Sequence, residues 1–192
     1  MHMPPDAASD AILKRESETA LLWSRLVPER WPLPLDKLPQ GTALVGGAVR
    51  DGLLNRLSST PDLDLVVPED ALGLTRRLAR ELNGTCVVLD EQRDMARLVL
   101  GDWTVDLSRR EGVDLNADLQ RRDYTVNAIA LPLRPCGVLV DPSGGLEDLR
   151  RRQLRAIQEQ NLIDDPLRLL RGLRLMAEQK LNLDSEAATW IQ

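Results

Sequence analysis

The strongest constraint on this chain is a short apolar run that ends in two glycines, followed by a second apolar run that carries two aspartates. The two runs read Leu44-Val45-Gly46-Gly47-Ala48-Val49-Arg50-Asp51 and Asp62-Leu63-Asp64-Leu65-Val66-Val67. The apolar residues predict buried strands, and the glycines, which lack a Cβ, allow a sharp turn and a close approach to a ligand. Because residues i and i+2 of a strand project to one face, Asp62 and Asp64 are expected to point the same way.

Each half of this pattern also has an ordinary structural explanation. A Gly-Gly pair alone is usually a turn, and an Asp-x-Asp pair alone is usually a solvated strand end. In this order and spacing the two halves favour a phosphate site, because amides at a helix start attract an anion. Two carboxylates on one face repel each other unless a cation lies between them, and Mg²⁺ is the cation expected beside a phosphate substrate.

Composition limits which side chains can carry the chemistry. The chain has 192 residues, 43% of them hydrophobic and 29% charged, which is typical of a soluble globular protein. With a single histidine, zinc and Ser-His chemistry are not expected, so acid–base or metal work falls to carboxylates. The net charge of −5 argues against a non-specific nucleic-acid coat. Two cysteines, no signal-peptide pattern and no membrane-spanning apolar run predict a cytoplasmic protein without a membrane partner.

Hydrophobic periodicity and chain breakers divide the sequence into elements. An amphipathic helix is expected over 6–27, followed by a proline-rich linker. Strands are expected over 43–45, 62–67, 85–90, 95–100 and 103–108, and again after the hairpin at Pro135-Cys136-Gly137. Helices are expected over 47–55, 70–82, 146–152 and from Pro166 onward. Gly101-Asp102 is typical of a two-residue hairpin turn, and the last helix is expected to bury Leu169, Leu173 and Met176.

Five further polar residues, one single residue and two pairs, are candidates for a site. Asp106 lies in an apolar run and would complete a carboxylate triad if its strand neighbours the one carrying the two aspartates. Asp123 and Asn127 are four residues apart and would meet on one helix face. Asp165 and Arg168 are three apart and are also neighbours on a helix surface; the plain alternative for this pair is an exposed ion pair worth under about 1 kcal/mol.

With these residues in place, the chain resembles the class II tRNA nucleotidyltransferase and bacterial poly(A) polymerase family. The resemblance covers roughly residues 40–180 and involves four motifs. The first motif is formed by the two runs above together. The other three are Arg121-Arg122-Asp123-Tyr124-Thr125-Val126-Asn127-Ala128, Asp141-Pro142-Ser143-Gly144-Gly145 with Asp148 and Arg155, and Asp165-Pro166-Leu167-Arg168. One departure is Asp164, which stands where many members have Glu.

The resemblance implies an α/β (α+β) fold. Its head would be a polymerase-β-like nucleotidyltransferase domain, with a mixed sheet flanked by helices, running into an all-α neck. Residues 1–39 would form a helical leader and linker, 40–148 the head and 149–192 the start of the neck. The body and tail domains of family members would be absent from this chain.

The resemblance also implies template-independent nucleotidyl transfer from CTP, and from ATP in members that add A, to the 3′-hydroxyl of tRNA. Asp62 and Asp64 would hold two Mg²⁺ ions, with Asp106 as the third carboxylate. The implied nucleotide-binding residues are Gly46, Gly47, Arg50, Arg122, Asp123, Asn127, Asp165, Arg168 and Arg171. The tRNA would be held mainly by the absent body and tail, and no oligomeric state is predicted.

Within the family, the length of one segment favours CC addition. Leu107–Gln120, fourteen residues, separate the third carboxylate from the second motif. Members that add the terminal A carry a longer flexible loop here, so the short segment resembles members that add only two C residues. The alternatives are a full CCA-adding enzyme, then an A-adding enzyme or poly(A) polymerase, and then a non-catalytic nucleotide- or RNA-binding module.

Overall fold

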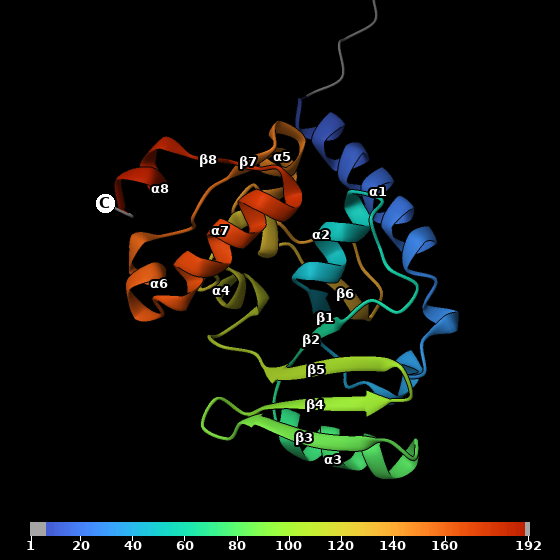
Figure 1. Ribbon diagram of the computed structural model, residues 1–192. Helices are drawn as coiled ribbons and strands as arrows, with labels where there is room; N and C mark the ends of the chain where they lie inside the picture. The colour runs from blue at the N-terminus through green and yellow to red at the C-terminus, as the bar shows by residue number, and fades with distance from the viewer. Residues whose placement is uncertain (1–6, 191–192) are drawn as a thin grey trace, which may run out of the picture.

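The computed structural model describes residues 7–190 and has a six-stranded mixed sheet flanked by helices (Figure 1). The expected α/β fold class is therefore confirmed. In chain order the elements are α1 (Ala7–Leu26), η1 (Pro28–Arg30), η2 (Leu35–Lys37), β1 (Thr42–Val45), α2 (Gly47–Leu53), β2 (Leu63–Val67), α3 (Ala71–Glu81), β3 (Thr85–Asp90), β4 (Met95–Leu100), β5 (Trp103–Arg109), α4 (Leu115–Gln120), η3 (Thr125–Asn127), β6 (Leu131–Arg134), α5 (Gly145–Arg151), β7 (Gln153–Leu154), α6 (Glu159–Asp164), α7 (Leu167–Gln179), β8 (Asn182–Leu183) and α8 (Ser185–Trp190).

The order of strands in the main sheet is β3-β4-β5-β2-β1-β6. Strands β2 and β5 are parallel, and every other adjacent pair is antiparallel. The β4–β5 hairpin closes through the predicted Gly101-Asp102 turn, with Gly101 at a φ of +59°. In β2 every residue except Asp64 is buried, so one carboxylate stands out of an otherwise apolar central strand.

Buried residues hold helix α1 against the rest of the molecule at several points. Leu22 and Leu26 belong to the main apolar core, and the indole Nε1 of Trp31 donates to the carbonyl of Leu26 at 3.0 Å. The hydroxyl of Thr19 accepts from the backbone N–H of Leu139 at 3.0 Å. The helix expected over 6–27 is found over Ala7–Leu26. Residue 6 lies outside the described residues, and Val27, with a φ of +43°, follows the end of the helix.

Two expectations for the second half of the chain are wrong. After the hairpin at residues 135–137 the chain makes an isolated bridge between Ala130 and Val140 rather than a strand. On α7, Leu173 is 58% exposed, because the buried residues of this helix are Gly172 and Leu175, and Gly172 packs against Tyr124.

Helix α7 approaches the rest of the chain most closely at Tyr124. This side chain is fully buried, and its hydroxyl donates to the carbonyl of Arg168 at 3.1 Å. Burial and the nearby Asp123 raise the pKa of Tyr124 to about 12, so the phenol stays a neutral donor. A Cβ on Gly172 would lie 2.0 Å from the phenol oxygen, so only glycine permits this approach.

The larger cluster of buried apolar side chains runs from Leu22 on α1 to Ala187 on α8. It crosses both expected domain boundaries, so the division into 1–39, 40–148 and 149–192 stays a prediction. Within the described part of the chain, no helix is long and apolar enough to span a membrane.

Gly172→Ala is expected to destabilise the protein by loosening α7 from Tyr124. Overpacking lowers the free energy of unfolding by about 1–3 kcal/mol, and the higher helix propensity of alanine offsets about 1 kcal/mol of this loss. The melting temperature should fall by about 2–4 °C for each kcal/mol of net loss. In a Tyr124→Phe background, which removes the nearest oxygen, the same substitution should cost less; equal melting-temperature losses in both backgrounds would contradict this account.

Candidate active site

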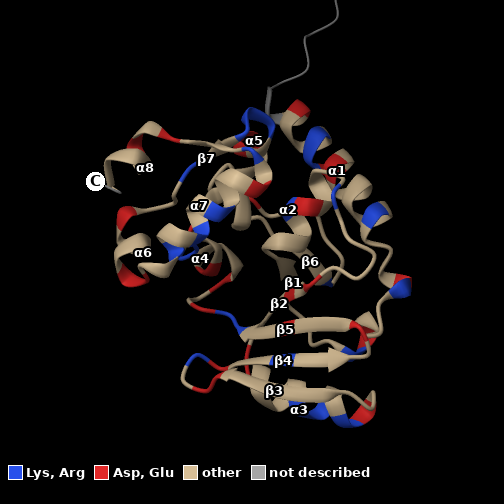
Figure 2. Cartoon of the chain, viewed as in Figure 1, with Lys and Arg blue, Asp and Glu red and all other residues tan. Residues whose placement is uncertain are grey.

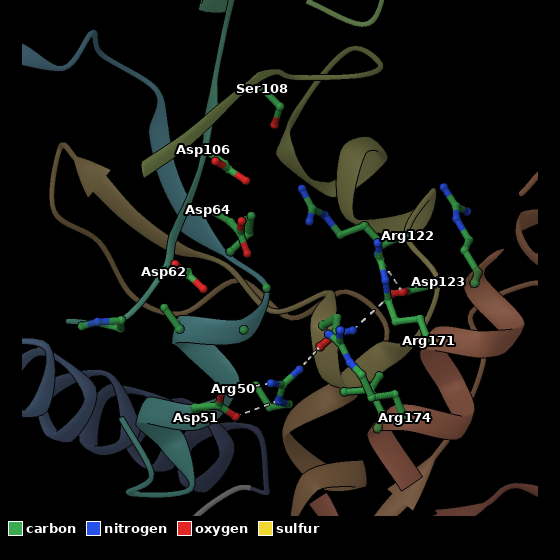
Figure 3. A pocket seen from close by; sticks show the side chains of 18 of the residues that line it. Arg50, Asp51, Asp62, Asp64, Asp106, Ser108, Arg122, Asp123, Arg171 and Arg174 are labelled. Carbon is green, nitrogen blue, oxygen red and sulfur yellow. Dashed lines mark hydrogen bonds and ion pairs between the residues drawn. The ribbon is translucent and has the colours of Figure 1, made fainter. Parts of the chain in front are cut away.

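A pocket of about 770 Å³ opens between the central strands and the helices that follow them (Figure 3). Its volume is in the range of small-molecule sites. Its walls include the β1–α2 turn, the ends of β2 and β5, the segment from α4 to η3, and α7. The predicted site residues that line it are Gly46, Gly47, Arg50, Asp62, Asp64, Asp106, Arg122, Asp123, Asn127, Arg168 and Arg171. Asp165 is not among the lining residues and adjoins the pocket through Arg168.

The sheet brings the three predicted carboxylates to one wall (Figure 3). Asp62 lies one residue before β2, Asp64 lies in β2, and Asp106 in β5 is the direct partner of Asp64 in the parallel register. Each carboxylate has different neighbours: Asp62 accepts from the hydroxyl of Thr104, while Asp106 accepts two hydrogen bonds from Arg97. The condition for a triad, that the strands be neighbours, is therefore met.

Asp64 is a carboxylate with a raised pKa. Burial raises its pKa, and the negative charges of Asp106 and Asp62 raise it further. The guanidinium of Arg122 and the backbone N–H of Gly47 lower it. A group that is buried among like charges is expensive to ionise, and perturbed groups of this kind cluster at functional sites.

The glycine turn is shaped by this carboxylate. Gly46 has a φ of +70°, a conformation that side chains rarely adopt, and a Cβ there would lie 2.7 Å from Oδ2 of Asp64. The turn therefore requires glycine for two independent reasons, its backbone angle and its closeness to Asp64.

The three carboxylates have the chemistry of a site for a hard divalent cation. Carboxylate oxygens are the ligands that Mg²⁺ prefers, and a cation would relieve the repulsion around buried Asp64. Among the residues that the structure describes, however, no three acidic, histidine or cysteine side chains are already grouped tightly enough to hold a metal. By its chemistry, the donor set fits the ion.

Arg50 is committed to neighbours within the protein. Its Nε and Nη2 donate to the carboxylate of Asp51 at 2.9 and 3.0 Å, and its Nη1 donates to Oδ1 of Asn127 at 2.6 Å. It lines the pocket, but this geometry makes it a link between α2 and η3; its predicted contact with phosphates stays a prediction.

Asp123 connects this network to α7. Its Oδ1 accepts from the amide of Asn127 at 3.4 Å, so the two residues meet as expected, although through a turn and η3 instead of along one α-helix. Its Oδ2 pairs with Arg171 at 3.2 Å, and Asp123 is itself buried.

A row of arginines forms the wall opposite the carboxylates. Arg168, Arg171 and Arg174 follow one another at intervals of three residues on α7 and line the pocket. Figure 3 labels Arg171 and Arg174, and Figure 2 shows the basic segments of α7 in blue. Arg122 faces the same space and is oriented by the buried Asp118, whose Oδ2 accepts from its Nη2 at 3.0 Å. Guanidinium groups suit multidentate contacts with phosphates.

Arg168 is held in place by backbone carbonyls. Its Nη1 donates to the carbonyls of Arg121 and Asn161 at 3.0 and 2.8 Å, and its Nε lies 3.7 Å from Oδ2 of Asp165. The buried Asn161 also donates from its side-chain amide to the carbonyls of Gln120 and Arg122. Asn161 thus fixes both Arg168 and the start of the second motif.

The third motif supports the site from outside the pocket. Asp141 accepts from the backbone N–H groups of Gly145 and Leu146 and so caps α5. Asp148 pairs with Arg155 at 2.9 Å and accepts from the hydroxyl of Thr125 at 2.6 Å. These contacts hold α5 against η3.

Sequence reasoning missed four of the residues that shape the site: Arg97, Ser108, Asp118 and Asn161. Ser108 lies two residues after Asp106, and strand alternation could have indicated that it lines the same pocket. Asp118 is four residues before Arg122, and Arg97 lies opposite Asp106 across the predicted Gly101-Asp102 turn, so local spacing could have indicated both pairs. No local pattern marks Asn161.

Asp64→Asn is expected to make the protein more stable at neutral pH in the presence of a chelator. The pKa of Asp64 is raised in the folded state, so the folded protein binds this proton more tightly and stability falls as pH rises through the interval above the ordinary value. The gain in melting temperature should therefore be present at neutral pH and shrink as the pH is lowered toward the ordinary carboxyl pKa. The exposed Asp102→Asn is the matched control, and a loss of stability at neutral pH would refute the role assigned to burial.

Comparison with known proteins places this geometry in a family. A family model described as the poly A polymerase head domain matches residues 102–155. The chain is 45% identical over 158 residues to the CC-adding tRNA nucleotidyltransferase of Synechocystis sp., covering 82% of this chain and 38% of that protein. It is 44% identical over 153 residues to the A-adding tRNA nucleotidyltransferase of Deinococcus radiodurans, covering 80% of this chain and 34% of that protein.

Solved structures give the same result. The fold matches that of a CCA-adding enzyme in complex with CTP with a TM-score of 0.75 and 30% identity, covering 90% of this chain and 44% of that one. It also matches a tRNA nucleotidyltransferase complexed with a primer tRNA and an incoming ATP analog, with a TM-score of 0.67 and 31% identity, covering 78% of this chain and 45% of that one. The chain thus spans less than half the length of these relatives. By its motifs, its fold and these relatives, it belongs to the family of tRNA nucleotidyltransferases and bacterial poly(A) polymerases.

Proposed function

We propose that the protein carrying this chain transfers nucleotides to the 3′ end of tRNA without a template, and that it is of the CC-adding type. The observation that carries the reaction is the wall of three carboxylates, Asp62, Asp64 and Asp106, facing a row of arginines across one pocket. Such a site can bind a divalent cation on one side and a triphosphate on the other.

In this proposal the tRNA 3′-oxygen bonds to the α-phosphorus of the incoming nucleotide, and pyrophosphate leaves. Two Mg²⁺ ions, bound by Asp62 and Asp64 with Asp106 as third carboxylate, would promote ionisation of the 3′-hydroxyl and neutralise charge on the leaving group. Arg122 and Arg171, which face the carboxylates, bind phosphate oxygens. The turn at Gly46 and Gly47 allows the nucleotide to lie close to the backbone.

Asp165 and Arg168 are proposed to read the base. C and A each present an exocyclic amino donor beside a ring-nitrogen acceptor, which a carboxylate and a guanidinium match. U and G instead present a carbonyl acceptor beside a ring N–H donor. They would leave the carboxylate and the guanidinium without hydrogen-bond partners, which would weaken binding by about 1–3 kcal/mol for each unpaired group. The two backbone carbonyls that hold Nη1 of Arg168 support this role, because a reader that is already oriented discriminates more sharply.

The CC-adding assignment is supported by the chain between the third carboxylate and the second motif. Strand β5 continues to Arg109 and α4 begins at Leu115, so residues 110–114 are all that remains between them. This leaves little room for the longer flexible loop of members that add A. CC-adding and A-adding relatives are both more than 40% identical to this chain, which is why the product must be measured.

The expected products of the complete gene product distinguish the candidates. It is incubated with tRNA that lacks its 3′-terminal CCA, Mg²⁺ and labelled CTP, with and without ATP, and the products are sized to one nucleotide. We expect addition to stop after two C residues even with ATP present. A further A would make this a CCA-adding enzyme. In a parallel reaction with labelled ATP and tRNA that ends in CC, addition of one A by a protein that does not use CTP would indicate an A-adding enzyme, and long A tails would indicate a poly(A) polymerase.

The same assay tests the carboxylates. Asp62→Ala should reduce incorporation by about a hundredfold or more, because the ions that it would bind supply several kcal/mol of transition-state stabilisation. Asp102→Ala, which removes an exposed carboxylate from the β4–β5 turn, is the control and should retain activity. If neither the wild type nor the variant incorporates nucleotides while both bind CTP, the non-catalytic binding module replaces this proposal.

Asp165→Asn is expected to relax base selection. An amide both donates and accepts, so U is no longer opposed by a fixed acceptor, and the ratio of kcat/KM for CTP over UTP should fall by about tenfold. Glu159→Gln, an exposed carboxyl change on the preceding helix, serves as control and should leave the ratio unchanged. An unchanged ratio in Asp165→Asn, with Arg168→Met also without effect, would show that the base is read elsewhere.

A further inference from the structure

Arg97 holds both oxygens of one of the three carboxylates. It lies directly opposite Asp106 in the antiparallel β4–β5 register. Its Nε donates to Oδ1 at 2.7 Å and its Nη2 donates to Oδ2 at 2.9 Å. The side chains are 42% and 23% exposed, so this bidentate pair lies at the pocket wall, where it is open to solvent and to ligands.

The other two carboxylates are not held in this way. Asp62 accepts a hydrogen bond from the neutral hydroxyl of Thr104, and Asp64 lies against the Gly46 turn. Within residues 7–190, Asp106 forms an ion pair with Arg97, whereas Asp62 and Asp64 form no ion pair with a basic side chain. The protein therefore neutralises one carboxylate of the wall selectively.

A carboxylate in a fork-to-fork pair with arginine has its two strongest acceptor directions occupied. A cation that binds Asp106 must either displace the guanidinium or share an oxygen with it through the remaining lone pair. Because both groups are positive, each weakens the binding of the other at this carboxylate.

We propose that Arg97 is a positioning residue that competes with the divalent cation for Asp106. Without nucleotide, Arg97 orients and neutralises Asp106 and keeps cation affinity at that carboxylate low. With the phosphate oxygens of a nucleotide as further ligands, a cation held by Asp62 and Asp64 would compete with Arg97 for Asp106 more strongly. The cation then completes its site at Asp106 together with the substrate rather than before it. This inference rests on the proposed function, since that function takes Asp106 as the third carboxylate.

The test measures binding of Mn²⁺ alone, without nucleotide or tRNA, by isothermal titration calorimetry and by electron paramagnetic resonance of the free ion. The variant is Arg97→Met in the complete gene product, which keeps a long apolar stem and removes every donor. We expect Mn²⁺ to bind about three- to tenfold more tightly than in the wild type. Adding Asp106→Asn to this variant should abolish the gain.

Arg109→Met is the matched control. Arg109 lines the same pocket, its side chain is 54% exposed, and its loose ion pair is with Asp94 at 3.9 Å rather than with Asp106. Its substitution removes the same charge and should change Mn²⁺ affinity by less than about twofold. Equal gains in both variants would mean that general charge, and not competition at Asp106, sets the affinity.

The other possible results of this experiment also test the inference about Arg97. Unchanged, weaker or undetectable Mn²⁺ binding in Arg97→Met, in a protein that melts like the wild type, overturns the inference. The proposed function fails separately: it is refuted if Mn²⁺ binding is indifferent to Asp62→Ala and no nucleotide is incorporated. An active enzyme whose Mn²⁺ affinity ignores Arg97 would thus overturn the inference alone.

Discussion

The parallel pairing of β2 with β5 is the constraint on which the rest of the site depends. It sets Asp64 directly beside Asp106 and leaves Asp62 at the start of the same strand. Burial raises the pKa of Asp64, and the negative charge of neighbouring Asp106 raises it further. The neighbouring positive and N–H groups reduce this repulsion. Arg97 pairs with Asp106, while Arg122 and the N–H of Gly47 favour ionised Asp64.

The second organising feature is the connection between the sheet and α7. Asp123 accepts hydrogen bonds from Arg171 on α7 and from the side-chain amide of Asn127 in η3. Asn127 in turn accepts a hydrogen bond from Arg50 on α2. Below this polar chain, Tyr124 packs against Gly172 so closely that no side chain fits between them. The wall of arginines is therefore held at a defined distance from the wall of carboxylates, which is what a site for a triphosphate requires.

Much of the local structure was predictable because it rests on short-range patterns. The strands over 85–90 and 95–100 are found with the expected bounds, since alternation and the turn residues around them are local. Leu173 was misassigned because a 3.6-residue period admits neighbouring stripes, and the choice between them was made by Gly172 meeting Tyr124. The residues after 137 look like a strand by composition, but they have just one bridge partner, Ala130, for Val140.

The sequence by itself determined the types of residue at the site, their order and the glycine turn, because these depend on spacing along the chain and on side-chain chemistry. It also determined the family, through motifs whose residues lie close together in the sequence. Only the tertiary structure decided which strands became neighbours, and hence that Asp106 joins Asp64. It also decided that Arg97 takes both oxygens of Asp106, and that Asn161 fixes Arg168. The strand order depends on contacts between residues far apart in the chain, and no periodicity encodes it. Arg97 and Asn161 are close to their partners in the sequence, but the atoms that pair are decided by how the side chains pack in three dimensions.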